Sequence, residues 1–568
     1  MKKFNSILFI ALLLVFSSCG DIFELDLQED PNNPTPETAD LESLYNSVQL
    51  QFAGFLSGPQ GFTMQLSRQI AFTAGNVYET AFSPNAFDGI WTTAYAGFLP
   101  DANAVIALAE PTQQFYHTGT ARIMQGYVLA TLVDLFGDVP FDQAQLGIEV
   151  LSPEAQDGAT LYGIAADLVQ AGIAELEMNA AAAPTFDFMY DGNIGGWIQA
   201  GNSLLLKLAV NTRDQATFNS IISGGNFISS ATNDWQFEYG NSRANPDSRH
   251  PLYGAHYEDN DGPYLGNWLM WAMNDEKPVV DPRIRGYFFR QFPSIPLDNN
   301  NRFDCIFSIV PDAASTPEHY LNCDPNMAYC AASLTDGYYG RDHGNGNGIP
   351  PDGDIRTRYG VYPMGGKFDN NIFINTQNLG TDGALGAGIH PIMPSFFVNF
   401  YRAEMAAMSG DMATAREQLL AGVAASIDKV VNFIIDRDPN SLSEVVGTDI
   451  VTGEPTFGSQ FLPSPSAVGA YLDVVAERFD SSSDPLDVIA LEALIAQYGN
   501  GIESYNLIRR TARPTNLQPA ILTSAGTFIR SALLPAVHVN LNQNATQKTV
   551  LDQVFWDTNP ASLGPCFN

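Results

Sequence analysis

The sequence predicts a mainly α-helical protein in which a long irregular, loop-rich insertion interrupts a body of paired helices. Three observations predict this class. Apolar residues recur at helical spacing up to residue 225, they do so again after residue 388, and the segment between is rich in Gly, Pro, Asn, Asp and aromatic residues. A hydrophobic content of 45% allows a large buried core. No clean fixed-period repeat accompanies the helices.

The chain begins with a predicted export signal. Lys2 and Lys3 precede an apolar run of about ten residues, too short to span a bilayer, and small residues then lead to Cys19. This order is typical of a bacterial lipoprotein signal over residues 1–18, with Cys19 lipidated after cleavage, although Phe16 stands where leucine is usual. An ordinary secretory signal is the alternative. Residues 19–40, acidic and rich in proline, are predicted to form an extended tether.

The remaining residues, 41–568, are predicted to form a single body, helical over 41–225 and 389–568, with the insertion over 226–388. Four early helices are expected, and Gly137 should end the second in a left-handed conformation. Their apolar patterns lie at residues 41–52, 121–135, 161–173 and 197–210. Helices are expected again from His390, with Asp411 as the N-cap of the second.

The charge balance excludes some partners. The chain has 62 acidic and 27 basic residues, a net charge of −35. So negative a surface repels nucleic acid and anionic lipid headgroups. Solubility is the simplest role of this charge, and binding of hard cations is the alternative.

The cysteines fit an exported protein. Besides Cys19 there are four, so one or two disulfides are expected, with three possible pairings left open. They are Cys305, Cys323, Cys330 and Cys566. The sequence contains no CxxC pair, so the cysteine spacings match no zinc-site signature.

Enzymatic motifs are missing. The sequence has no HExxH, no GxSxG and no Walker motif. A glycosidase-like pair of carboxylates cannot be picked out among 62 acidic residues. We therefore predict that the protein is not an enzyme, and a surface polysaccharide hydrolase is the less favoured alternative.

One loop of the insertion, "GRDHGNGNGIPPDGDIR" (residues 340–356), concentrates glycine, proline, amides and carboxylates. Its carboxylates would repel phosphate, and the EF-hand pattern fails because Gly344 and Gly346 occupy two ligand positions. Its side chains could still supply some of the about six to eight oxygen ligands that calcium takes. These candidates are Asp342, Asn345, Asn347, Asp352 and Asp354. Structural turns, a calcium site of another type and direct ligand contact all stay open.

Aromatic residues form the other candidate site. Tyr264, Trp268 and Trp271 stand among Asp and Asn residues of the insertion, and Tyr78 and Trp91 lie between two early helices. Sugar rings stack on aromatic faces while amides and carboxylates bind the hydroxyl groups, so these five residues are candidate carbohydrate contacts. The alternative is that they anchor the insertion to the helical core.

Several motifs occur in a fixed order along nearly the whole mature chain. After Cys19 and its acidic followers come "DPNNPT" (30–35), "LVDLFGDVPF" (132–141), "YDGNIGGWIQAGNSLLLKLAV" (190–210), "DPRI" (281–284), the loop at 340–356, "YNLIRRTARP" (505–514) and "LPAVHVNLN" (534–542). Together they resemble the SusD/RagB family of nutrient-binding outer-membrane lipoproteins of Bacteroidota. Phe141, Gly201 and Lys207 depart from the family's Tyr, Ala and Arg.

The resemblance implies tetratricopeptide-like helix pairs, a place on the outer face of the outer membrane, and a SusC-like TonB-dependent transporter as partner. It implies an oligosaccharide ligand, or a peptide as in some members. The motifs are mostly structural in that family, so they transfer no ligand-contact residue. We therefore expect a nutrient-binding lipoprotein that delivers its ligand to the transporter. No cofactor is predicted unless residues 340–356 form the alternative calcium site. A binder of peptide or another nutrient, of the same importer type, is the second reading.

Overall fold

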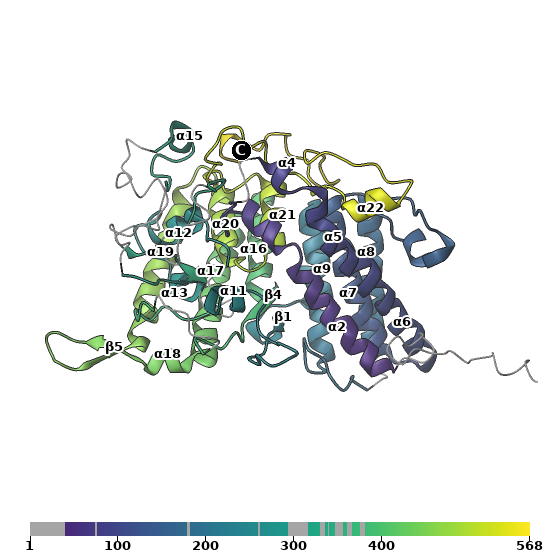
Figure 1. Cartoon of the computed structure of the whole chain (residues 1–568), viewed down its shortest axis with the longest axis horizontal. Helices are drawn as coiled ribbons and strands as arrows, with labels where there is room; N and C mark the ends of the chain where they lie inside the picture. Colours follow the sequence, from purple (N-terminus) through teal and green to yellow (C-terminus); the bar gives the residue numbers. More distant parts are fainter. Residues whose placement is uncertain are drawn as a thin grey trace, which may run out of the picture.

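The computed structural model describes residues 40–73, 77–178, 182–259, 262–293, 316–329, 336–338, 340–346, 356–359, 366–374 and 381–567. Residues 1–39, with the predicted signal, Cys19 and nearly all of the tether, lie outside this part. The described chain is mainly α-helical, with short two-stranded sheets, and this confirms the predicted fold class (Figure 1).

The first half is helical, and its helices α2 and α5 to α9 lie side by side in Figure 1. Their bounds are α2 (Leu41–Ser57), α3 (Gln60–Leu66), α4 (Tyr78–Ala81), α5 (Asp88–Thr92), α6 (Leu99–Ala109), α7 (Phe115–Phe136), α8 (Gly158–Glu177), α9 (Ile194–Thr212) and α10 (Gln215–Gly224). The four helices expected from periodicity correspond to α2, α7, α8 and α9. Gly137 ends α7 with φ 76° as expected, but its ψ of −117° lies outside the left-handed helical region.

Helices α7 and α8 pack antiparallel at very close range. A Cβ on Gly119 would lie 2.7 Å from Gly172 O, one on Gly126 would lie 2.9 Å from Ala165 O, and one on Gly158 would meet Val133. As the residue number rises along α7 it therefore falls along α8. Glycine at these crossings lets the two backbones touch.

The insertion contains only short elements among its described residues. They are β1 (Trp235–Glu238), α11 (Tyr253–Tyr257), α12 (Asn267–Asn274), α13 (Ile284–Tyr287), β2 (Phe288–Phe289), α15 (Glu318–Leu321) and β3 (Arg358–Tyr359). Strand β1 pairs antiparallel with β4 (Ile389–Met393), and β2 pairs antiparallel with β3. The insertion is thus bound to the helical body through β4.

The last part of the chain returns to helices. Its elements are α16 (Ser395–Ser409), α17 (Met412–Arg437), α18 (Pro439–Ser443), β5 (Val445–Thr448), β6 (Pro455–Phe457), α19 (Pro465–Ser481), α20 (Pro485–Ala496), α21 (Gly501–Thr511) and α22 (Ala536–Leu541). Asp411 caps α17 by accepting a hydrogen bond from Thr414 N–H, as predicted. The helices begin at Ser395 rather than at His390, because Pro391 and Pro394 disfavour helix in the residues before them.

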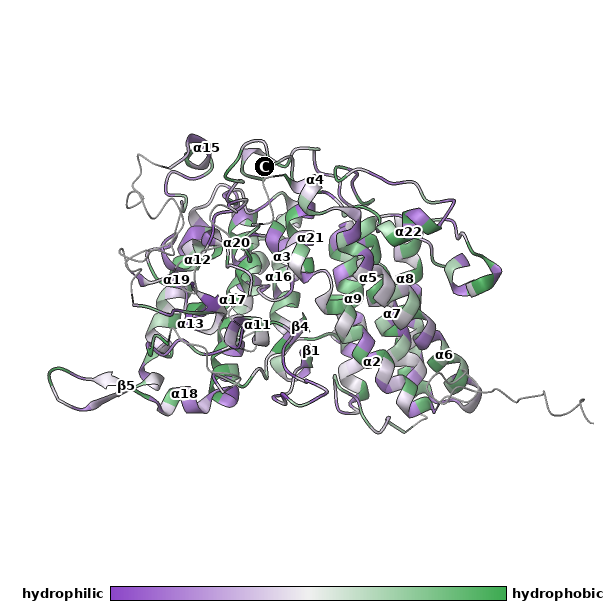
Figure 2. Cartoon of the chain, in the orientation of Figure 1, coloured by the Kyte–Doolittle hydropathy of each residue, from purple (hydrophilic) through white to green (hydrophobic). Residues whose placement is uncertain are grey.

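One described helix, α17, is long and apolar enough to cross a membrane by length and composition alone. It packs against α16, α19 and α20 instead, and half of its apolar window is buried in the protein. Hydrophobic and hydrophilic residues alternate along the helices generally, as expected for helices that share one core (Figure 2).

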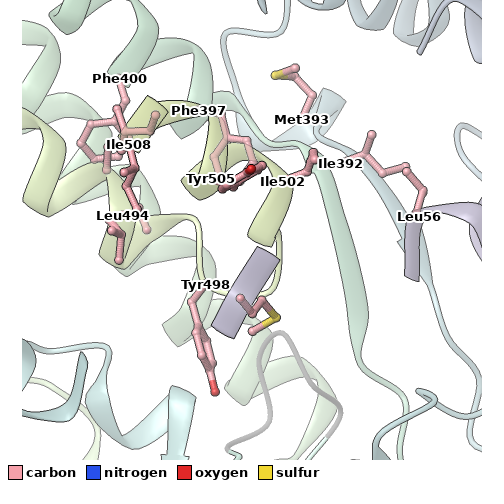
Figure 3. Close-up of a cluster of buried hydrophobic side chains, with 14 of the residues drawn as sticks. Leu56, Ile392, Met393, Phe397, Phe400, Leu494, Tyr498, Ile502, Tyr505 and Ile508 are labelled. Atoms are coloured by element: carbon pink, nitrogen blue, oxygen red, sulfur yellow. The ribbon is translucent and has the colours of Figure 1, made fainter. Parts of the chain in front are cut away.

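The hydrophobic core joins the two helical sets at β4. Figure 3 shows Ile392 and Met393 of β4 between Leu56 of α2 and side chains of α16 and α21. All of these residues are buried. Strand β4 therefore sits between the early and late helices, and the pairing of β1 with it places the insertion at the same junction.

A buried polar network ties together the sequence motifs. Lys207 Nζ lies 2.5 Å from Glu503 Oε1 and 3.8 Å from Asp134 Oδ2. Asp134 also accepts hydrogen bonds from Asn506 Nδ2 at 2.7 Å and from Trp556 Nε1 at 3.1 Å. Burial alone would lower the pKa of Lys207, but the neighbouring Glu503, Tyr127 and Asp134 together outweigh burial and raise that pKa. The motifs around residues 134, 207 and 506 thus brace α7, α9 and α21 against one another.

A disulfide joins Cys323, just after α15, to Cys566 near the C-terminus, with their Cα atoms 5.5 Å apart. It is one of the pairings that the sequence left open. Cys305 and Cys330 lie outside the described residues.

Candidate functional site

The described part of the predicted loop, residues 340–346, lies between three segments that are distant in sequence. Arg341 N–H donates to Leu265 O, Gly344 N–H donates to Phe72 O, and Ile521 N–H donates to His343 O, all at 2.8–3.0 Å. We call these residues and the segments 68–73, 77–78, 262–268 and 516–521 the loop cluster. It brings together five residues predicted to form sites: Tyr78, Tyr264, Trp268, Asp342 and Asn345.

Asp342, predicted as a calcium ligand, is buried and already binds two amides. Its Oδ1 accepts hydrogen bonds from Asn267 Nδ2 and Gln518 Nε2, each at 2.9 Å. Asn345 is buried beside it, while the other predicted ligands lie outside the described residues: Asn347, Asp352 and Asp354. In the described ranges, no group of three or more His, Cys, Asp or Glu residues could hold a metal ion. The calcium site stays a prediction.

A tyrosine–histidine pair lies at the centre of the loop cluster. The hydroxyl of Tyr78 lies 2.6 Å from Nε2 of His343. Burial lowers the pKa of His343 well below its usual value, and the Arg68 guanidinium lowers it further; burial also raises the pKa of Tyr78. Both groups are therefore neutral, so the phenol donates to the imidazole. Neither is more than 2% exposed, which leaves a substrate in solvent no access to the pair.

Two arginines lie over the ring of Tyr264. The guanidinium carbons of Arg341 and Arg356 lie 4.9 and 4.4 Å from the centroid of its ring. Arg356 also donates to Gly262 O at 2.6 Å. These cation–π contacts fix Arg341 and Arg356 to the segment 262–266.

All five aromatic residues predicted to contact carbohydrate are packed inside the protein, with at most 7% of any of them exposed. Trp268 donates its indole N–H to Asn516 O at 2.8 Å, and Trp271 is buried in the same helix, α12. Trp91 lies apart from the loop cluster, against His538 of α22. A stacking platform needs an exposed ring face. The structure gives these rings an anchoring position, and their contact with ligand stays a prediction.

A partly open cavity of about 230 Å³ lies beside the loop cluster. Ile70 and Pro263 line it, and they belong to two extended segments joined by the Ile70–Leu265 bridge. The rest of its wall comes from the end of α2, from α3, from the segment after β1, from β4 and from the turn before α21. These residues are Ser57, Gln60, Gly61, Gln65, Tyr239, His250, Pro251, Leu252, His390 and Gly499. The cavity therefore lies at the junction of the insertion and the two helical sets.

The cavity wall is uncharged. None of its lining residues is Asp, Glu, Lys or Arg. Burial lowers the pKa of His250 to about 3, with His390 contributing, and burial lowers the pKa of His390 to about 4. Both imidazoles are therefore neutral at physiological pH, and the cavity offers only neutral donors, neutral acceptors and ring faces.

The sequence pattern does not point to these cavity residues. They come singly or in runs of two or three from segments scattered between Ser57 and Gly499, and no motif or spacing groups them. A larger hollow of about 490 Å³ lies over α8, α9 and α10, but alanine, glycine and leucine form much of its wall and it lies away from the insertion.

The chain resembles known proteins in sequence and in fold. Residues 31–303 match the model of a SusD-like family described as "Starch-binding associating with outer membrane". No curated protein sequence matches the chain.

Solved structures extend the likeness over most of the chain. A SusD-like protein of Bacteroidetes is 18% identical, with a TM-score of 0.61, and covers 92% of this chain and 100% of its own. A SusD/RagB family protein of Bacteroides thetaiotaomicron is 16% identical, with a TM-score of 0.60 and the same coverage. A chitin-binding SusD homologue of Flavobacterium johnsoniae is 15% identical, with a TM-score of 0.57, and covers 91% of this chain and 99% of its own.

Proposed function

Because the chain belongs to the SusD/RagB family, we propose that it is a lipid-anchored protein on the outer face of the outer membrane that binds an oligosaccharide and delivers it to a SusC-like TonB-dependent transporter. The observation that carries the proposal is the fold, which solved SusD-like structures share over 91–92% of the chain. Two of the matching structures are chitin-binding proteins, which favours a carbohydrate ligand.

Binding without catalysis is the favoured activity. The tyrosine–histidine pair of the loop cluster is buried and neutral, and its geometry offers no nucleophile to a substrate in solvent. A tethered binder needs no chemistry to help uptake, because tethering raises the concentration of ligand near the transporter. Lipidation at Cys19 and residues 19–40 would supply that tether.

The transporter partner is tested by affinity purification of the tagged full-length protein from gently solubilised native outer membranes. We expect a TonB-dependent barrel at about equal stoichiometry in the eluate, identified by mass spectrometry. A Cys19→Ala variant, purified in parallel, is the control and should yield less barrel because it lacks the lipid anchor. Recovery of the wild-type protein alone would contradict delivery to a transporter.

The ligand class is tested with soluble polysaccharides in affinity electrophoresis. Retardation by at least one neutral glycan, without release of reducing ends, is expected for a binder. Release of reducing ends would instead favour the hydrolase alternative, and retention of peptides only would favour a peptide importer.

A further inference from the structure

We infer that the cavity between Gln65, Tyr239 and His250 is a binding site for one ring of an uncharged saccharide. The choice of a saccharide among uncharged molecules rests on the proposed function. The cavity itself is a separate observation, since its wall shares no residue with the five aromatic side chains predicted to contact ligand.

Two residues of the wall, Gln65 and His250, carry hydrogen-bonding atoms that could serve a ligand. Oε1 of Gln65 is buried and has no hydrogen-bond donor among the described residues. Nδ1 of His250 accepts a hydrogen bond from Leu252 N–H at 3.2 Å. The neutral ring therefore carries its proton on Nε2, which is left as a donor. A buried unsatisfied amide oxygen is unfavourable, so a hydroxyl or amide that reaches it gains free energy.

The other polar side chains of the wall are less available. Gln60 donates to Leu56 O at 3.0 Å and accepts from Gly501 N–H at 2.7 Å, so it is committed to α2 and α21. The ring of Tyr239 packs edge-to-face on His250, with centroids 4.9 Å apart. With Ile70, Pro251, Leu252 and Pro263, this pair gives the cavity the mixture of apolar faces and few polar groups that suits a sugar ring.

Size limits the ligand to a single ring. A volume of 230 Å³ equals about eight water molecules at roughly 30 Å³ each. That is enough for one six-membered ring with its substituents, and a longer saccharide would have to extend out of the cavity.

Charge limits the ligand to neutral sugars. The wall holds no cationic side chain to pair with a carboxylate, and the protein as a whole carries a net charge of −35. An acidic sugar would lose its hydration without gaining an ion pair.

A glycine in the wall allows the cavity to be filled. A Cβ added to Gly61 meets no heavy atom within 4 Å, so Gly61→Phe places a ring at the cavity wall without a clash at its base. Gly54 of α2 is also helical, exposed and open at its Cβ, but it does not line the cavity. Gly54→Phe is therefore a matched control. Gln65→Met is a second variant, which removes the amide at nearly constant size.

The experiment measures glucose, N-acetylglucosamine and glucuronate binding to the full chain by saturation-transfer NMR, alongside the glycan that retards the protein in electrophoresis. Wild type and Gly54→Phe should bind a neutral monosaccharide and not glucuronate. Gly61→Phe should weaken binding at least about 10-fold, and Gln65→Met about 3- to 10-fold for the loss of one hydrogen bond.

Three outcomes would overturn the inference. Equal binding by Gly61→Phe, Gln65→Met and wild type would place the sugar elsewhere while leaving glycan binding by the protein intact. Binding of glucuronate as strong as that of glucose would contradict the selectivity. Failure of wild type to bind any neutral monosaccharide would reject the cavity as a sugar site, and glycan retardation would then show separately whether the proposed function stands.

Discussion

Buried ionisable side chains in this protein are accommodated in two ways: one keeps its charge beside opposite charges, and others are neutral. Lys207 keeps its charge because Glu503 and Asp134 lie beside it in the core. His250 and His390 instead remain neutral, because burial holds the pKa of each near 3 to 4. The first arrangement braces helices, and the second keeps the cavity free of charge.

The neutral histidines predict a loss of stability in mild acid. Below about pH 6.5 the unfolded chain binds protons at both histidines while the folded chain does not, so the free energy of unfolding falls as the pH drops towards about 4. Each histidine contributes about 1.4 kcal/mol per pH unit in that window. Urea unfolding of wild type and His390→Gln at pH 6.5 and 5.0 should show a fall that is smaller by about 2 kcal/mol in the variant. Equal falls would mean that His390 is protonated in the folded protein.

At the scale of elements, glycine sets how closely helices approach. Gly119 and Gly172 face each other so tightly that a Cβ on Gly172 would lie 2.4 Å from Gly119 O. Gly126, further along α7, is similarly close to Ala165 and Val169 of α8. Since Cβ atoms do not fit at these crossings, α7 and α8 can pack at this distance only with glycine.

Substitution at one crossing should therefore destabilise the pair. A Cβ in Gly126→Ala would lie 2.5 Å from Val169 Cγ2, and overpacking of this kind costs about 1–3 kcal/mol. Gly163→Ala, on the exposed face of α8 with no neighbour within 4 Å, is the control and should be neutral or stabilising by up to about 1 kcal/mol. Chemical denaturation measures both. A stable Gly126→Ala variant would mean that α7 and α8 separate easily.

At the scale of the whole molecule, the insertion is attached to the rest of the protein at two places. Strand β1 pairs with β4 at the junction of the helical sets. The Cys323–Cys566 disulfide joins the segment after α15 to the C-terminal end, across 243 residues of sequence. A disulfide that closes so long a loop strongly restricts the unfolded chain. It is also compatible with the exported location that the sequence predicts.

Removal of this disulfide should lower the free energy of unfolding by about 2–4 kcal/mol. The double variant Cys323→Ser, Cys566→Ser, compared with wild type by thermal unfolding, measures the loss. Reductant should lower the Tm of wild type to that of the variant. A further fall when the variant itself is reduced would indicate the second disulfide that the sequence allows, and an unchanged Tm in the variant would contradict a stabilising role for the first.

Much of the fold can be predicted from the sequence because helices are local. The apolar spacing around residues 41–52 and 161–173, and the cap at Asp411, depend on neighbours within a few residues. The helix expected from His390 in fact begins at Ser395, and the sequence also contains the reason, since Pro391 and Pro394 disfavour helix before Ser395. The order of the motifs along the chain likewise indicates the family, because that order is a property of the amino-acid sequence alone.

The helical class, the positions of the main helices and the family thus follow from the amino-acid sequence. Three-dimensional packing was needed to establish that Trp268 and Tyr264 are buried, that Cys323 pairs with Cys566, and that Gln65, Tyr239, His250 and His390 surround one cavity. The physical reason is the range of the interactions. Helical periodicity is set by residues three or four apart, whereas burial, disulfide pairing and a cavity wall depend on contacts between residues that are tens to hundreds of positions apart, which single-sequence patterns do not encode.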